Sequence, residues 1–175
     1  MKCHHCQHEH NLDELELAFD SPDAVFALQE PDRTARADMT PDLCMLDGSR
    51  FFLRAVLPIP CEGRRLPFNL GLWVETDKQS YCRYVELYSD PNQGREPHFP
   101  ATIANSVGGY WDLLGLAVNV QLVSETARPT LTCVDQSHPV ARDQLNGISG
   151  SRALDILSPY PVSYTHLTLP TNREV

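Results

Sequence analysis

Short stretches rich in apolar and aromatic residues recur along the first half of the chain and predict β-strands. These stretches cover residues 43–46, 51–59 and 68–75. The dipeptides Asp47-Gly48 and Glu62-Gly63 separate them, and such dipeptides are typical of hairpin turns. The pattern therefore indicates consecutive strands joined by short connections.

A second group of strands is predicted later in the chain, at residues 116–124 and 128–134. In the first of these segments, every second residue is apolar, so one face of the strand is apolar. The apolar positions are Leu116, Val118, Val120 and Leu122. Together, the two groups predict an antiparallel sheet of about five strands.

Within residues 79–88, Tyr81, Tyr84, Val85 and Tyr88 recur every three or four positions, which is the period of an α-helix with one apolar stripe. The predicted helices cover residues 24–28, a short segment after Pro31, and residues 79–88, 137–146 and 149–157. Ser21-Pro22-Asp23 and Ser149 are typical of helix starts, and Gly147 is typical of a helix end. Residues 91–100 contain three prolines and are expected to be a loop. The chain is thus expected to be an α+β protein with short helices packed on the sheet.

Composition limits the size and the surroundings of this fold. The chain has 175 residues and is 42% hydrophobic, so we expect a single domain over residues 1–160. No apolar run is long enough to cross a bilayer, and no secretory signal precedes the first strand, so we expect a cytoplasmic protein that is not bound to a membrane. The net charge of −9 works against binding to nucleic acid.

The first twelve residues resemble half of a zinc knuckle. Cys3 and Cys6 are separated by two residues, and His10 follows four positions later, which is a spacing that places three ligands around one ion. A closed structural site needs a fourth ligand, for which Cys44 is the candidate. The alternative is adventitious metal binding by the other histidines of this segment, His4, His5 and His8.

The remaining cysteines are interpreted through the redox state of the expected compartment. Because the cytosol is reducing, the six cysteines are interpreted as metal ligands or small buried apolar groups rather than as disulfides.

Three arginines are candidates for binding a carboxylate or a phosphate, because a guanidinium group matches both anions. Arg33 and Arg36 share one face of a predicted helix, and Arg54 lies in a predicted strand. The simpler interpretation is that each of these arginines pairs with a nearby acid. The acids nearest to the two helical arginines are Glu30, Asp32 and Asp38.

His138 stands at a predicted helix start, with Asp135 and Asp143 nearby in sequence. This combination suits proton transfer, and it is the best candidate for catalytic chemistry in the chain. The alternative is that His138 caps the helix and packs against it. No nucleophile for His138 to activate is evident, since residues 147–151 lack the glycine spacing of a nucleophile elbow.

From Cys3 to about Ser158 the chain resembles a bacterial family catalogued as domain of unknown function 2199. The matching motifs are Cys3-x-x-Cys6 with His10, Arg33-x-x-Arg36, Asp42-x-Cys44, Phe51-Phe52-x-Arg54, Ile59-Pro60-x-x-Gly63, Gly71-x-Trp73-Val74 and His138-Pro139-x-Ala141-x-x-Gln144-x-x-Gly147-Ile148. Gln7 and Pro58 depart from the family pattern. The resemblance implies a shared fold and adds Gln144 to the candidate ligand-binding residues. It implies no activity.

Residues 161–175 are expected to be a non-native tail. The codons permitted for residues 161–171 include one continuous run that resembles a sequencing adapter read as protein. The residue types alone suggest a short terminal strand over residues 163–169 instead.

These observations favour a cytosolic interaction module with a structural zinc site, whose partner is an unknown protein, for example a basic one. The competing hypothesis is a small hydrolase or transferase that uses His138 with the arginines, or an open zinc site with a bound water.

Overall fold

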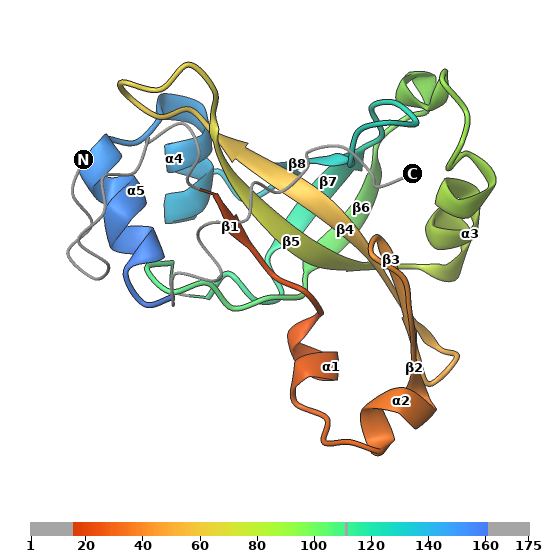
Figure 1. Ribbon diagram of the computed structural model, residues 1–175. Helices are drawn as coiled ribbons and strands as arrows, with labels where there is room; N and C mark the ends of the chain where they lie inside the picture. Colours follow the sequence, from red (N-terminus) through yellow and green to blue (C-terminus); the bar gives the residue numbers. More distant parts are fainter. Residues whose placement is uncertain (1–15, 111, 161–175) are drawn as a thin grey trace.

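The computed structural model describes residues 16–110 and 112–160, and its framework is an eight-stranded sheet (Figure 1). The strands are β1 (Leu17–Ala18), β2 (Ala37–Met39), β3 (Leu43–Leu46), β4 (Arg50–Ile59), β5 (Phe68–Thr76), β6 (Phe99–Ile103), β7 (Ala117–Gln121) and β8 (Thr130–Cys133). The helices are α1 (Asp23–Phe26), α2 (Asp32–Arg36), α3 (Lys78–Glu86), the 3₁₀ turn η2 (Gln93–Arg95), α4 (Pro139–Asn146) and α5 (Gly150–Leu157). The expected tail, residues 161–175, lies outside the described residues.

Strands β4 to β8 close into a barrel because β5 pairs with both β4 and β6, and β8 returns to β4. The two longest strands, β4 and β5, are antiparallel neighbours over nine residue pairs, from Phe51–Thr76 to Ile59–Phe68. The closing pair β4–β8 is parallel and has a single register pair, Val56 with Thr130. Closure removes the free edges that these five strands would otherwise present.

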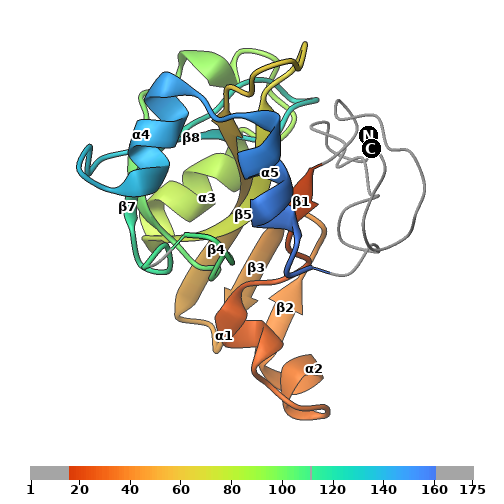
Figure 2. The same cartoon turned by 90° about the vertical axis from the view of Figure 1, so that its left-hand side faces the viewer.

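The core fills the barrel because alternate residues of its strands are apolar and point inward. Leu53, Ala55 and Leu57 of β4 lie opposite Val74, Leu72 and Leu70 of β5, and all six side chains are fully buried. Helices α4 and α5 lie at one end of the barrel and α3 lies at the other (Figures 1 and 2). None of the helices within the described residues is both long and apolar enough to span a bilayer.

Residues 20–47, which we call the N-terminal lobe, extend away from the barrel and contain α1, α2, β2 and β3 (Figure 1). A second apolar cluster joins this lobe to the outer face of the barrel. It consists of Val25, Cys44, Leu46, Phe52, Trp73 and Ala104. Trp73 and Phe52 are fully buried in it.

The α+β class predicted from the sequence is confirmed, but the sheet is larger than expected and is not purely antiparallel. Strands β1 and β2 have two and three residues, which is too short to produce a periodic signal. The pairs β1–β5 and β4–β8 are parallel, and no local pattern reveals such long-range pairing. The prediction of a loop over residues 91–100 is partly wrong, because η2 lies within it and β6 begins at Phe99.

The predicted end of α4 and the predicted start of α5 are confirmed, whereas α4 begins at Pro139 rather than at residue 137. His138 and Ser149 cap α4 and α5 by accepting hydrogen bonds from Val140 N and Arg152 N. Gly147 ends α4 with a φ of 82°, a conformation that favours glycine. At α1 the cap position is Pro22 rather than Ser21, and no side chain caps the helix.

Candidate functional site

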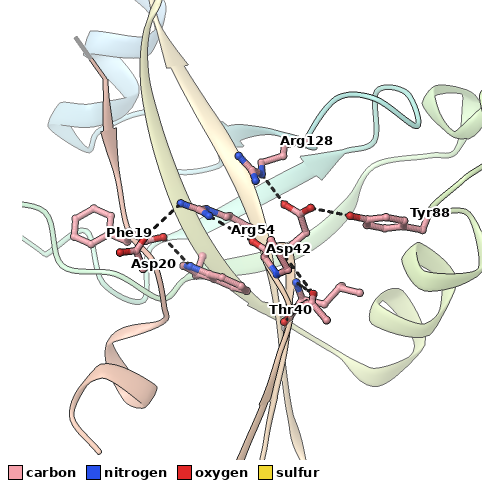
Figure 3. A network of polar contacts seen from close by, with 10 residues as sticks. Phe19, Asp20, Thr40, Asp42, Arg54, Tyr88 and Arg128 are labelled. Carbon is pink, nitrogen blue, oxygen red and sulfur yellow. Dashed lines mark hydrogen bonds and ion pairs between the residues drawn. The ribbon is translucent and has the colours of Figure 1, made fainter. Parts of the chain in front are cut away.

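A buried cluster of charged side chains lies where the N-terminal lobe joins the barrel (Figure 3). Oδ1 of Asp42 accepts a hydrogen bond from Nε of Arg128 at 2.6 Å, and Oδ2 accepts one from the Tyr88 hydroxyl at 2.7 Å. Asp42 directly precedes β3, Arg128 lies just before β8, and Tyr88 follows α3. Three segments that are distant in sequence therefore meet at one carboxylate.

The turn between β2 and β3 fixes the position of Asp42. The Thr40 hydroxyl oxygen accepts hydrogen bonds from Leu43 N at 3.0 Å and Asp42 N at 3.4 Å, and Thr40 N donates to Leu43 O. Pro41 restricts the backbone in the middle of this turn. The Asp42 carbonyl accepts a hydrogen bond from Arg54 N at 2.9 Å, so the turn is also attached to β4.

Both members of the ion pair are withheld from water, since Asp42 is 1% exposed and Arg128 is 4% exposed. A buried charge that loses its partner costs about 3–5 kcal/mol, because the remaining charge cannot be solvated. Here both carboxylate oxygens have a donor, and the bond to the guanidinium group is charge-assisted. This geometry suits a rigid joint between the lobe and the barrel more than an open ligand site.

The structure does not bring the three candidate arginines together in a shared contact. Arg54 contacts the Pro41 carbonyl through Nη1 at 3.4 Å and the Asp20 carboxylate through Nη2 at 3.9 Å (Figure 3). Arg33 and Arg36 both lie in α2, where they make separate contacts. Arg54 therefore attaches β4 to the turn after β2 and to the segment before α1.

The two arginines of α2 are used locally. Arg33 donates through Nη2 to the carbonyls of Phe26 and Leu28, at 3.1 and 2.8 Å, and lies 4.0 Å from Glu30. Arg36 forms a two-pronged ion pair with Asp47, with both N–O distances at 2.8 Å. That pair lowers the pKa of the Asp47 carboxyl. The acid that pairs with Arg36 is thus not one of those nearest in sequence.

His138 caps α4 through Nδ1, which accepts a hydrogen bond from Val140 N at 3.2 Å. Asp143 instead accepts a hydrogen bond from the Tyr110 hydroxyl at 2.7 Å, and Asp135 accepts one from the Ser137 hydroxyl at 2.6 Å. Since Nδ1 and both carboxylates have these partners, the geometry favours the capping role of His138 over proton transfer.

Gln144 closes the seam between β8 and β4. Its side chain accepts a hydrogen bond from Cys133 N at 3.1 Å and donates to Leu131 O at 2.8 Å and Pro58 O at 3.5 Å. Because β4 and β8 share one register pair, the Gln144 amide supplies hydrogen bonds where the two strands separate. The position of Gln144 in α4 thus has a structural explanation.

Cys44 lies in β3 and is fully buried against the apolar side chains of the second cluster. Burial, aided by the negative charge of Asp38, raises the pKa of its thiol to about 11. Within residues 16–110 and 112–160, no group of three or more metal-ligating side chains occurs. Cys3, Cys6 and His10 lie outside the described residues, so the zinc site stays a prediction, and the surroundings of Cys44 suit a small buried apolar group.

A surface hollow of about 490 Å³ lies between the segment after β4 and the segment after α4. It is lined by Pro60, Cys61, Glu62, Asn146, Gly147, Ile148 and Ser149. Backbone hydrogen bonds of 2.8 Å join Glu62 N to Ile148 O and Ile148 N to Pro60 O. Burial raises the pKa of the Cys61 thiol, so this cysteine is protonated at neutral pH and is a poor nucleophile.

The sequence model of one protein family, described as "Uncharacterized protein conserved in bacteria (DUF2199)", matches residues 2–148. The chain belongs to this family. The match confirms the resemblance inferred from the motifs and includes Asp42, Arg54, Arg128 and Gln144. The searches of curated proteins and of solved structures found no match.

In this DUF2199 chain, sequence reasoning identified Arg54, whose backbone N–H bonds the Asp42 carbonyl, but missed the buried cluster of Asp42, Arg128 and Tyr88. Asp42 belonged to a recognised motif, yet no spacing rule connects it with Arg128, 86 positions away. Tyr88 was interpreted as part of an apolar stripe, although its hydroxyl is bonded to the buried carboxylate. Arg128 stands directly before Pro129 at the start of a predicted strand, and nothing in that local sequence indicates a buried ion pair.

The N-terminal lobe carries an excess of acidic over basic residues. Residues 20–47 contain seven acidic residues and two arginines, which gives a net charge of −5. Apart from the buried Asp42 and the half-buried Asp23, these acids are exposed. Phe26 is also exposed on the lobe, at 67%. The lobe thus presents one large exposed aromatic side chain together with an excess of acids.

Proposed function

We propose that this DUF2199 protein is a binding module whose N-terminal lobe docks a basic partner protein. The observation that carries the proposal is the combination, on one projecting lobe, of a net charge of −5 with an exposed phenylalanine. Opposite charge on a partner steers its approach, and a desolvated aromatic side chain then supplies affinity.

The lobe's own cations do not neutralise this surface. Arg36 forms an ion pair with Asp47, and Arg33 donates hydrogen bonds to the carbonyls of Phe26 and Leu28. Asp32 and Asp38 are exposed, and neither forms an ion pair with another described residue. Their carboxylates are therefore available to a lysine or arginine of a partner.

The experiment measures binding of a ten-residue polylysine peptide to the full chain by isothermal titration calorimetry. Asp32→Asn with Asp38→Asn removes two charges from the lobe. The matched control, Glu62→Gln with Asp155→Asn, removes two exposed charges elsewhere. We expect the lobe variant to bind at least fivefold more weakly and the control to bind within twofold of the parent.

Equal weakening of both variants would show that the whole acidic surface, and not the lobe, attracts the peptide. Such a result would overturn the proposal. A polyglutamate peptide tests the sign of the charge and is expected not to bind. Raising the salt concentration is expected to weaken polylysine binding, because exposed charges are screened.

The proposal includes a cytosolic location and a structural zinc held by Cys3, Cys6 and His10. Two thiolates and an imidazole fit zinc, which would tie the N-terminal segment into one closed knuckle. Metal analysis of tag-free protein tests this, with Cys3→Ser and Cys44→Ser as matched variants. We expect about one zinc per chain in the parent, lost in Cys3→Ser. Retention in Cys44→Ser would assign the fourth position to another ligand, and a parent without zinc would end the zinc hypothesis.

A further inference from the structure

Strand β2 is the last strand at one end of the sheet, and in the described structure no strand lies on its outer side (Figures 1 and 2). Asp38 and Met39 are exposed, and so is Thr40 directly after the strand. An edge of this kind presents backbone groups that another chain can pair with. The lobe that carries the acidic surface thus also carries an open sheet edge.

The register of β2 on β3 shows which backbone groups face outward. Asp38 lies opposite Met45, and the flanking bonds join Asp47 N to Arg36 O and Thr40 N to Leu43 O. In an antiparallel pair, bonded positions alternate with positions whose N–H and C=O point away. The backbone groups of Ala37 and Met39 therefore point toward the free edge.

Of these outward groups, one is already used within the lobe. The Ala37 N–H donates to Arg33 O at the end of α2. The Ala37 carbonyl and both polar groups of Met39 have no hydrogen bond to another described backbone group. Three backbone groups are therefore positioned to bond an added strand.

Side chains alternate across this edge in a way that specifies the partner. Met39 lies opposite Cys44, which belongs to the second apolar cluster, so Ala37 and Met39 share the apolar face. Asp38 lies opposite Met45 and points to the other face. Met39 remains 37% exposed. An added strand would meet an apolar surface on one face and a carboxylate on the other.

We propose that the β2 edge binds an extended segment of a partner protein as an added strand, in which lysine or arginine alternates with apolar residues. This inference rests on the proposed function and specifies how the basic partner is held. Backbone bonds to Ala37 and Met39 supply the pairing, and Asp38 selects the basic side chains. A second copy of this chain is disfavoured, because pairing of two β2 edges brings two Asp38 carboxylates together.

The test uses the full chain and an acetylated, amidated peptide of five Lys-Val repeats, with two N-methylated forms. One form carries N-methyl groups on every valine and the other on every lysine. In antiparallel pairing, the residue opposite Met39 has its side chain on the apolar face and bonds Met39 through its own N–H and C=O. We therefore expect the valine-methylated peptide to bind at least tenfold more weakly, and the lysine-methylated peptide to bind within threefold of the unmodified one.

Loss confined to the lysine-methylated peptide would also support strand addition, in the parallel direction, since the donors then come from the other set of residues. Equal binding of all three peptides, or equal loss in both methylated forms, would overturn the inference. If the unmodified peptide and polylysine both fail to bind, the proposed function itself fails. If binding depends on the lobe acids but not on the methylation pattern, only the strand addition fails.

A variant of the protein tests the same backbone bond by changing the β2 edge instead of the peptide. Met39→Pro removes the outward N–H without removing a bond to β3, and proline is tolerated at such edge positions. Met39→Ala is the matched control, because it shortens the side chain and keeps the N–H. We expect Met39→Pro to weaken peptide binding at least tenfold relative to Met39→Ala. Should Met39→Pro fail to fold, the methylated peptides decide the question with the parent protein.

Discussion

The buried pair of Asp42 and Arg128 allows one quantitative prediction about the joint between the lobe and the barrel. Asp42→Asn preserves the shape of the side chain and one acceptor oxygen, but it removes the charge that faces the guanidinium group. Because both side chains are at most 3% exposed, water cannot replace the lost charge. We expect the free energy of unfolding to fall by about 3–5 kcal/mol.

For a protein of this size, each kcal/mol lowers Tm by about 2–4 °C, so the expected loss in Tm is roughly 6–20 °C. Urea unfolding followed by circular dichroism gives the change in free energy directly. The transition midpoint is expected to fall while the slope stays constant, since the surface exposed on unfolding does not change. Circular dichroism before unfolding verifies that the variant retains its secondary structure.

The matched control is Asp47→Asn, which breaks the pair with Arg36. That pair has similar N–O distances, but its two side chains are 45% and 40% exposed. Exposed pairs contribute about 0–1 kcal/mol, so the control is expected to unfold almost as the parent does. If the two variants lose stability to within about 1 kcal/mol of each other, burial does not determine the strength of the joint, and our reasoning is refuted.

Three further variants test other parts of the fold. Gly147→Ala is expected to lower Tm more than Gly48→Ala. Gly147 has φ 82° and ψ 170°, and an added Cβ would lie 3.1 Å from the Pro60 carbonyl oxygen, whereas at Gly48 the space is open. A larger loss of Tm in Gly48→Ala would contradict this. Gln144→Leu is expected to cost about 1–3 kcal/mol in urea, since it leaves backbone groups of the seam without partners; an unchanged midpoint would show that the seam does not need the amide. Burial is the main cause that raises the pKa of the Glu16 carboxyl, so the charged form of Glu16 opposes folding once the pH exceeds that pKa. Glu16→Gln should therefore raise Tm at pH 8 and give little gain at pH 4, where Glu16 is already protonated. An equal gain in Tm at both pH values would contradict this sign.

Local patterns revealed most of the individual elements because each carried its own signal. The alternation at Leu116 to Leu122, the tyrosine spacing of α3 and the glycine after α4 all act over a few residues, and the structure confirms each of them. The closing of the barrel escaped prediction because it depends on β4 meeting β8, about 75 positions later. Pairing across such a distance is decided by packing and not by neighbouring residues.

The same limit applies to the candidate site. Arg54 and His138 stood out by residue type, but a residue's type does not reveal which partner it finds. Asp42 and Arg128 meet because β3, which follows Asp42, and β8, which follows Arg128, both pair with β4. The excess of acids over residues 20–47 was readable from the sequence, whereas the projection of that segment as a lobe required the structure.

The parallel seam between β4 and β8 makes the barrel mechanically uneven. Its main-chain pairing rests on the Val56–Thr130 register, with the bond from Val56 N to Pro129 O at 2.8 Å, while β4 and β5 are paired along nine positions. Slow fluctuations that open the wall should therefore begin at this line, where few bonds must break together. Amide hydrogens along the seam should exchange with solvent earlier than those between β4 and β5. Since Gln144 bridges the seam from α4, local unfolding of that helix would allow β4 and β8 to separate, which would convert the closed barrel into a curved open sheet.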